Sequence, residues 1–327
     1  MRPVPEKALS TLATHCGAEP TGLTKIGGGE PWSDGIVYAF DTPAGERRVL
    51  KILAFDPADT QAQARFQARV DFVHFLGERG VPIAYPLVLP SGGLVEQDLA
   101  DGTLFCAYVM ERIDGHTIDA HDPTQWNDAF FQRWGAVVGH MHRLTGEYTG
   151  DVPATLGLDW RTEMDGFEAI CQEEEVKAVW CELRSELEAL PRDRTCFGFV
   201  HNDPHPWNLV ISADGSLTVL DFDCANYHWF MADIAIAAYG AYMGAGGGPE
   251  RPPRELDFPA RFLSAFRAGY ETEFHLEQAW WERLPLFLRY RSALLFMCFY
   301  DEVAKHPEHM RRWVSRLQEN APIPPRA

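Results

Sequence analysis

The residues best suited to chemistry lie in one short polar loop. The segment HNDPHPWN at 201–208 follows an apolar, strand-like stretch. After it come a second apolar stretch, a turn, and a third stretch that runs directly into an Asp-Phe-Asp triplet beginning at Asp221. Apolar stretches joined by a tight turn predict a hairpin. We expect this hairpin to bring Asp203, Asn208 and Asp221 close together.

Two acids and an amide in this arrangement suit phosphoryl transfer from ATP. The reaction needs a carboxylate to orient and deprotonate a hydroxyl, and hard oxygen ligands for Mg²⁺. Asp203 can supply the base, while Asn208 and Asp221 can supply the ligands. Asn208 follows Asp203 closely and Asp221 lies on the next hairpin, as in kinase catalytic loops. Asp223 can hold a second ion, because residues two apart on a strand face the same way.

A zinc hydrolase is the alternative interpretation of the same loop. His201, Asp203 and His205 form an HxDxH pattern that is plausible for zinc. Of the other histidines, only His228 lies near this loop in the sequence, and no His-rich cluster follows at ligand spacing. We therefore favour the phosphotransfer site.

Length and composition indicate a globular protein of two domains. The chain has 327 residues, of which 46% are hydrophobic and 23% charged. Its net charge is −18, from 29 Lys+Arg and 47 Asp+Glu. Such a chain repels the phosphate backbone, so we expect no nucleic-acid partner. The same field favours a cationic acceptor.

Cysteine usage and hydropathy predict a cytoplasmic protein without a membrane segment. The seven cysteines are scattered and form no CxxC pair, which predicts free thiols in a reducing compartment. The N-terminal MRPVPEKALS lacks the apolar core of a secretory signal. The uncharged stretch 234–248 is too short to span a bilayer, and Arg289 and Arg291 interrupt the apolar run 284–300.

The elements that position the loop divide the chain into two parts. Residues 1–112 show short strand patterns at 35–40, 47–53, 93–97 and 103–110, with a helical pattern at 60–79. Residues 113–327 read mostly as helices, at 125–144, 160–190 and 261–318. We therefore expect an α+β protein with a small antiparallel-sheet domain at 1–112 and a larger helical domain at 113–327.

The loop and its surroundings resemble a known family. HNDPHPWNLV followed by VLDFDCANYHWFMADIA is similar to the aminoglycoside phosphotransferase and choline kinase-like family, whose loop reads close to HGDxHxxN. The Gly-rich hairpin, Lys51, the segments GVPIAYPL and MERIDG, and GHMHRLT follow in family order. The resemblance implies a two-lobed protein kinase-like fold with ATP between the lobes. It also implies transfer of the γ-phosphate of MgATP to a hydroxyl.

The resemblance assigns roles to the residues of the loop. Asp203 matches the catalytic base, and His201 matches the histidine that braces the turn. His205 takes the place of a lysine that many protein kinases have two residues after the base. Asn208 and Asp221 match the Mg²⁺ ligands, with Asp223 as the further candidate. The positions that match the nucleotide-binding part of the family are Lys51, Gly28, Gly29, Ser33, Glu111 and Ile113.

The chain departs from the family pattern on the nucleotide side. The family pairs the strand lysine with a Glu on the small-domain helix, but here no Glu lies between Gln61 and Gly77. Asp71 is the candidate partner of Lys51. The loop GGGEPWSDG also lacks the GxGxxG spacing. A nucleotide-binding protein without transfer activity is therefore one alternative function.

The acceptor implied by the resemblance is a small molecule of the aminoglycoside, choline or homoserine kind. A Ser/Thr protein kinase of the family's stress-kinase branch is the second alternative. The sequence predicts neither the identity of the acceptor nor the oligomeric state.

Overall fold

The chain forms two compact units. The computed structural model describes residues 3–29, 35–150 and 154–323. The N-terminal unit comprises residues 1–115 with the segments 148–156 and 212–214, and the C-terminal unit comprises the remainder. All seven cysteines are free. Over the described ranges, no helix combines the length and apolar character needed to cross a membrane.

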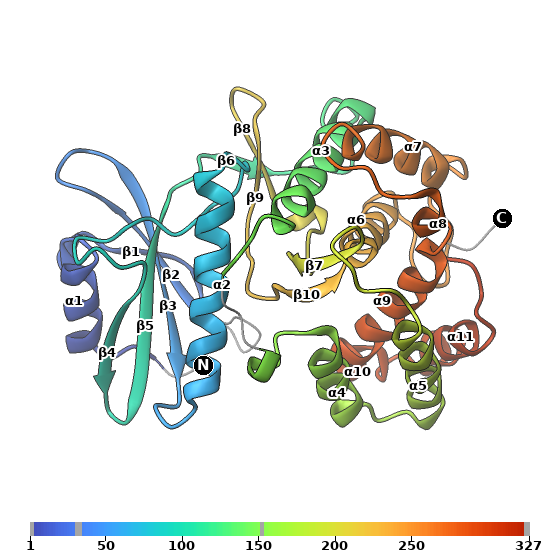
Figure 1. The fold of residues 1–327 in the computed structure, drawn as a ribbon, viewed down its shortest axis with the longest axis horizontal. Helices are drawn as coiled ribbons and strands as arrows, with labels where there is room; N and C mark the ends of the chain where they lie inside the picture. Colours follow the sequence, from blue (N-terminus) through green and yellow to red (C-terminus); the bar gives the residue numbers. More distant parts are fainter. Residues whose placement is uncertain (1–2, 30–34, 151–153, 324–327) are drawn as a thin grey trace. The chain divides into compact units, whose positions relative to one another are not determined.

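The N-terminal unit is built on a five-stranded antiparallel sheet of order β1-β2-β3-β5-β4 (Figure 1). The strands are β1 (Thr24–Gly28), β2 (Gly35–Asp41), β3 (Arg47–Phe55), β4 (Glu96–Ala100) and β5 (Thr103–Glu111). Three of the expected strands are confirmed within two residues. The strand expected at 93–97 instead begins at Glu96, after a turn in which Gly92 has a φ of +86°.

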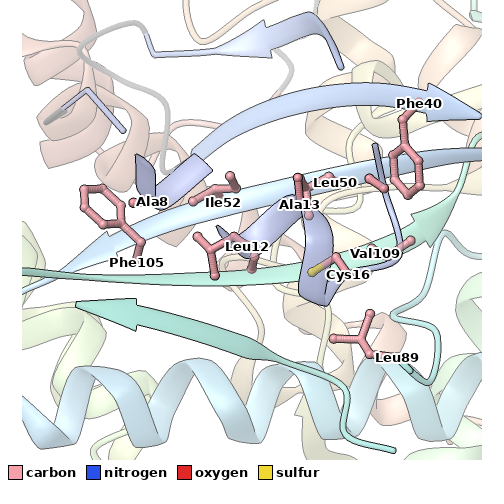
Figure 2. Close-up of a cluster of buried hydrophobic side chains, with 12 residues drawn as sticks. Ala8, Leu12, Ala13, Cys16, Phe40, Leu50, Ile52, Leu89, Phe105 and Val109 are labelled. Carbon is pink, nitrogen blue, oxygen red and sulfur yellow. The ribbon is translucent and has the colours of Figure 1, made fainter. Parts of the chain in front are cut away.

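A helix covers each face of this sheet. Helix α1 (Glu6–His15) packs its buried Leu12 onto the face that carries Leu50 and Ile52, and Figure 2 shows these side chains between helix and sheet. The opposite face carries Leu53, which packs with the buried side chains of α2 (Thr60–Glu78). Side chains alternate between the faces of a strand. β3 therefore supplies apolar side chains to both layers.

The C-terminal unit is mainly helical. Its helices are α3 (Asp128–Thr145), α4 (Trp160–Ile170), α5 (Glu174–Glu188), α6 (Phe230–Gly244), α7 (Phe258–Tyr270), α8 (Gln278–Trp281), α9 (Leu284–Cys298), α10 (Tyr300–Val303) and α11 (Pro307–Gln318). Figure 1 shows α6 among the other helices of this unit. Residues 230–242 of α6 are all buried. A helix that is apolar on every side is stable only when neighbours cover it all round.

Short strands carry the polar loop of this unit. Strand β7 (Phe197–Val200) pairs with β10 (Asn226–Trp229). Strands β8 (Leu209–Ser212) and β9 (Leu217–Val219) form the predicted hairpin, with β6 (Gly115–Thr117) beside β8. The two hairpin strands and their pairing partners hold residues 201–208 and 221–223 at their ends.

Helices α3 and α7 approach so closely that only glycine fits between them. A Cβ added at Gly269 would lie 1.8 Å from the backbone oxygen of Gln132, and one added at Gly135 would lie 1.9 Å from that of Phe266. Neither neighbour is a flexible side-chain end, so the two helices would have to move apart.

We therefore expect Gly269→Ala to lower the free energy of unfolding by about 1–3 kcal/mol, as overpacking does. The matched control is Gly166→Ala in α4, because a Cβ there meets nothing within 4 Å. That control should gain about 0.5–1 kcal/mol from the reduced entropy of the unfolded chain. Urea unfolding of the two variants measures the difference. Equal stability of the two would contradict the close contact.

Candidate active site

The buried carboxylate of Asp233 fixes the start of the polar loop. It accepts the backbone N–H of His201 at 3.2 Å and that of Asn202 at 2.7 Å. His142 of α3 contacts the same carboxylate at 3.2 Å, and its other ring nitrogen lies 2.9 Å from the Tyr270 hydroxyl. Asp233 is fully buried in the first turn of α6. The loop backbone is thus attached to the core of the unit.

The His201 ring joins the two segments that carry the acids. Its Nδ1 accepts the backbone N–H of Asp203 at 3.2 Å, and its Nε2 lies 3.0 Å from the backbone oxygen of Leu220. Nε2 must donate to a carbonyl, so this pattern defines the neutral ring with its proton on Nε2. Both ring nitrogens are engaged by backbone groups. His201 therefore braces the loop rather than binding zinc.

Asn208 completes the connection between the two acidic segments. Its side-chain nitrogen donates to the backbone oxygen of Asp203 at 3.0 Å, which directs the amide oxygen the other way. Its backbone oxygen accepts the N–H of Leu220 at 2.8 Å, so Asn208 lies beside the residue that precedes Asp221. Two hydrogen bonds within one unit thus join Asp203, Asn208 and Leu220, the residue that precedes Asp221.

Two cationic or proton-donating side chains bracket the Asp203 carboxylate. His205 Nε2 lies 3.2 Å from Oδ2, and Arg291 of α9 donates to Oδ1 at 2.7 Å. Burial by itself raises the pKa of this carboxyl. The hydrogen bond from His205 and the charge of Arg291 outweigh that effect, so the pKa is lowered. Asp203 is therefore held as a carboxylate.

Asn202 and Asp221 both have left-handed backbone conformations. Their φ angles are +64° and +65°. A non-glycine residue pays about 1–2 kcal/mol for this region, and Asn and Asp tolerate it best. Asn202 stands where the related family loop reads Gly. Strained backbone of this kind concentrates at functional sites.

A buried carboxylate holds Asn202 in place. The Asn202 side-chain amide donates to Glu163 of α4, which also accepts from Asn226 at 3.0 Å and from the Tyr290 hydroxyl. Burial raises the pKa of the Glu163 carboxyl, although these donors and the charge of Arg291 oppose it. Glu163 thus ties the loop to α4, β10 and α9.

Sequence reasoning did not identify Glu163 or Arg291 as part of the site. Arg291 contacts a residue 88 positions away, and Glu163 a residue 39 positions away. The available signal was the charge of Arg291, which together with Arg289 interrupts an apolar run. A charged side chain on a buried helix face needs a partner.

The remaining acid of the triplet, Asp223, is half-buried, whereas Asp221 is exposed. Over residues 3–29, 35–150 and 154–323, no group of three His, Cys, Asp or Glu side chains is arranged to hold a metal ion. The expected donor set differs from such a group, because it includes the amide oxygen of Asn208. Oxygen donors of mixed amide and carboxylate type suit Mg²⁺.

The predicted nucleotide-binding residues lie in the N-terminal unit. Gly28 and Gly29 have φ angles of +76° and +91°, and a Cβ at Gly28 would lie 2.0 Å from the Gly35 oxygen. Glu111 ends β5, and Ile113 follows it half-buried. Ser33 lies outside the residues that the structure describes. These glycines, Glu111 and Ile113 belong to the N-terminal unit, whereas the acidic residues Asp203, Asp221 and Asp223 belong to the C-terminal unit.

Lys51 occupies the face of β3 that packs against α2. It pairs with Tyr108, whose ring belongs to the cluster under α2. Directly opposed residues on neighbouring strands share a face. A Cβ at Gly35 would lie 3.3 Å from Lys51 Cε, so the lysine stem runs across that glycine. Asp71 is exposed and accepts from Gln67 on its own helix at 2.8 Å.

Comparison with known proteins identifies the family. The model of the Phosphotransferase enzyme family matches residues 24–295. The chain belongs to this family. It is 31% identical over 232 residues to amicoumacin kinase of Bacillus subtilis (strain 168), an alignment that covers 69% of this chain and 67% of the relative. The resemblance predicted from the sequence is confirmed, and the chain is an enzyme of the kinase type.

Solved structures of the family share the fold. A solved amicoumacin kinase in complex with AMP-PNP, Ca²⁺ and Ami matches with a TM-score of 0.84 and 24% identity, over 98% of this chain and 95% of that one. A microcompartment-associated aminopropanol kinase matches at 0.67 and 17%, over 97% and 95%. A spectinomycin phosphotransferase matches at 0.58 and 13%, over 98% of each chain. The predicted kinase-like α+β fold is confirmed.

The left-handed conformation of Asn202 generates a test of the loop geometry. We expect Asn202→Ala to lower the free energy of unfolding by about 1–3 kcal/mol, because a buried hydrogen bond is lost. Asn202→Gly loses the same bond but relieves the backbone strain, so it should be about 1 kcal/mol more stable than the alanine variant. Thermal and urea unfolding of both variants measure this order. Greater stability of Asn202→Ala would contradict the assigned conformation.

Proposed function

We propose that this enzyme transfers the γ-phosphate of MgATP to a hydroxyl group of a small-molecule acceptor. One observation carries the proposal: hydrogen bonds join Asp203, Asn208 and the Leu220–Asp221 segment into a single assembly. That assembly offers a carboxylate base and two oxygen ligands for a metal ion, which are the groups that phosphoryl transfer requires.

The loop residues have two tasks: one residue accepts the proton of the acceptor hydroxyl, and the others bind the metal ion. Asp203 orients the acceptor hydroxyl and takes its proton as the new O–P bond forms and the bond to ADP breaks. His205 and Arg291 keep Asp203 ionised until then. The Asn208 amide oxygen and the Asp221 carboxylate would hold the metal ion, and Asp223 would be the candidate ligand of a second ion. Bound Mg²⁺ offsets the charge on the phosphate oxygens.

The N-terminal unit supplies the nucleotide side. Gly28 and Gly29 allow the backbone to approach the phosphates, since a side chain at Gly28 would collide with Gly35. Lys51 steadies the phosphates as a cation on the apolar face of β3. The backbone at Glu111 and Ile113 meets the adenine. The related amicoumacin kinase solved with AMP-PNP and Ca²⁺ supports both nucleotide and divalent-metal binding.

A small-molecule acceptor is favoured over a protein acceptor. The similar proteins named above act on amicoumacin, aminopropanol and spectinomycin. The bracketed Asp203 carboxylate also favours transfer over nucleotide binding alone, because a protein that only binds nucleotide has no need of an ionised base.

Replacement of the base tests the proposal. Asp203→Ala should lower kcat by about 10²–10⁴-fold, the usual contribution of a general base, while MgATP affinity changes little. Asp221→Ala should instead weaken MgATP binding, because Asp221 holds the metal. ADP release and calorimetric titration of MgATP measure the two effects. Asp257→Ala, an exposed acid at the start of α7, is the control and should keep the original turnover. Wild-type turnover in Asp203→Ala would remove Asp203 from the mechanism.

The surroundings of Asp203 predict the acid limb of the pH profile. Arg291 lowers the pKa of the Asp203 carboxyl, so its removal lets the carboxyl protonate at a higher pH. We therefore expect the acid limb of kcat/KM to move to higher pH in Arg291→Met. In Arg291→Lys, which keeps the charge, the acid limb should stay closer to the pH at which it lies in the wild type. A limb that is unchanged, or that moves to lower pH, in Arg291→Met would refute the role of Arg291.

A further inference from the structure

Two side-chain connections run side by side between the polar loop and α9. In the first, Arg291 donates to the Asp203 carboxylate at 2.7 Å. In the second, the Tyr290 hydroxyl and the Asn202 amide both donate to the carboxyl group of Glu163. Tyr290 directly precedes Arg291 in α9. Asn202 directly precedes Asp203 in the loop. The two connections therefore join neighbouring residues of the same two segments.

The two oxygens of the Glu163 carboxyl group serve different segments. Oε1 contacts the Tyr290 hydroxyl of α9. Oε2 accepts the amide of Asn202 in the loop and, at 3.0 Å, the amide of Asn226 in β10. The amides donate, whereas a tyrosine hydroxyl can donate or accept. The same three contacts can therefore form whether or not the Glu163 carboxyl carries a proton.

The direction of these bonds explains why a carboxyl group stands at this position. Glu163 as a whole is half-buried, but its carboxyl end is enclosed, and this burial raises the pKa of the group. An apolar side chain of similar volume often fills such a place without loss of stability. The carboxyl group is thus better accounted for by the segments it connects than by a gain in stability.

Tyr290 transmits the position of Glu163 to Arg291. The Tyr290 ring stacks on Trp180 at 5.0 Å and lies 5.5 Å from the His228 ring, so packing and the hydroxyl together fix this side chain. Consecutive helix residues are only about 1.5 Å apart along the axis. The Arg291 side chain has many rotamers, so its reach to Asp203 depends on where the helix backbone is held.

Asn202 transmits the position of Glu163 to Asp203 in the same way. Its left-handed backbone, with a φ of +64°, is unfavourable unless contacts on both sides hold it. Asp233 holds its N–H at 2.7 Å, and Glu163 holds its side chain. The Asp203 backbone therefore leaves Asn202 in a fixed direction.

We propose that Glu163 is a positioning residue of the phosphotransfer reaction: by holding Asn202 and Tyr290, it fixes the approach of Arg291 to Asp203. The inference rests on the proposed function, in which Asp203 is the base. It extends that function to a residue that acts on the base only through its neighbours in the loop and in α9.

Four variants of the full-length protein test the inference. Glu163→Met removes all three contacts, and Tyr290→Phe removes one hydroxyl while the ring stays packed. Glu163→Gln is the conservative variant, because its amide oxygen can accept from both asparagines and its NH₂ can donate to the tyrosine hydroxyl. The matched control is Tyr300→Phe in α10, which also loses a tyrosine–glutamate bond, here to Glu173 at 2.6 Å.

The first measurement needs no acceptor. Hydrogen–deuterium exchange of the backbone N–H groups of Asn202 and Asp203 reports how firmly the loop is held. We expect exchange at least about tenfold faster in Glu163→Met and about threefold faster in Tyr290→Phe. Glu163→Gln and Tyr300→Phe should stay within about twofold of the wild type. If Glu163→Met does not fold, Tyr290→Phe and its control decide the result.

The second measurement is ADP release from MgATP, with amicoumacin as the acceptor probe and with water alone. We expect kcat to fall at least about tenfold in Glu163→Met and less in Tyr290→Phe, while KM for MgATP stays within about twofold. A misplaced base loses rate without losing nucleotide affinity. In Glu163→Met combined with Arg291→Met, the loss should be smaller than the product of the single losses, because both changes disturb one contact.

Several results would overturn the inference. Unchanged exchange in Tyr290→Phe and in a folded Glu163→Met would show that Glu163 does not hold the loop. Glu163→Gln as impaired as Glu163→Met would indicate that charge, and not the direction of the bonds, is what matters. An equal loss of kcat in Tyr300→Phe and Tyr290→Phe would reduce the effect to general stability.

Failure of the proposed function would look different. In that case neither acceptor would give ADP, and Asp203→Ala would release as little as the wild type. The exchange rates would still follow the predicted order, because they depend on the contacts of Glu163 and not on catalysis. Exchange and turnover are measured separately, so each result points to one of the two statements.

Discussion

The Asp233 carboxylate receives two consecutive backbone N–H groups, those of His201 and Asn202, while it lies fully buried against His142. A buried carboxylate is stable only when donors surround it. The loop thereby satisfies Asp233, and Asp233 in turn fixes the path of the loop. The later contacts of the loop start from this anchored backbone, including the His201 ring on Leu220 and the Asn208 amide on Asp203.

Around this anchor the site balances burial against charge. Burial raises the pKa of Asp203, but the hydrogen bond from His205 and the charges around the carboxylate, chiefly that of Arg291, lower it by more. Glu163 lies deeper, and there burial prevails despite the donors of Asn202, Asn226 and Tyr290. The two carboxyls lie on one network through Arg291, yet their ionisation is pushed in opposite directions. This difference favours the carboxylate form of Asp203, whereas burial favours the protonated form of Glu163.

Local patterns explain why much of the fold could be predicted. Strands β2 and β3 are rich in apolar residues and are bounded by turn residues. The apolar residues of α2 recur at helical spacing. The grouping of Asp203, Asn208 and Asp221 also followed from the sequence, because a short hairpin with a tight turn leaves its ends few alternatives. Local sequence patterns could not predict the partner of Lys51. Asp71, the candidate, makes its hydrogen bond to Gln67 within its own helix.

The sequence alone determined the order of the elements, the polar hairpin and the family, because these depend on residues close together in the chain. Tertiary structure decided the electrostatics of Asp203, since Arg291 reaches it from 88 residues away. It also decided which side chains of α6, α9 and α11 meet around the hollow lined by Tyr239, Leu295 and Trp313, because these residues lie far apart in the chain. Net charge is a sum over the whole surface, whereas recognition depends on the few groups that a fold gathers within contact distance.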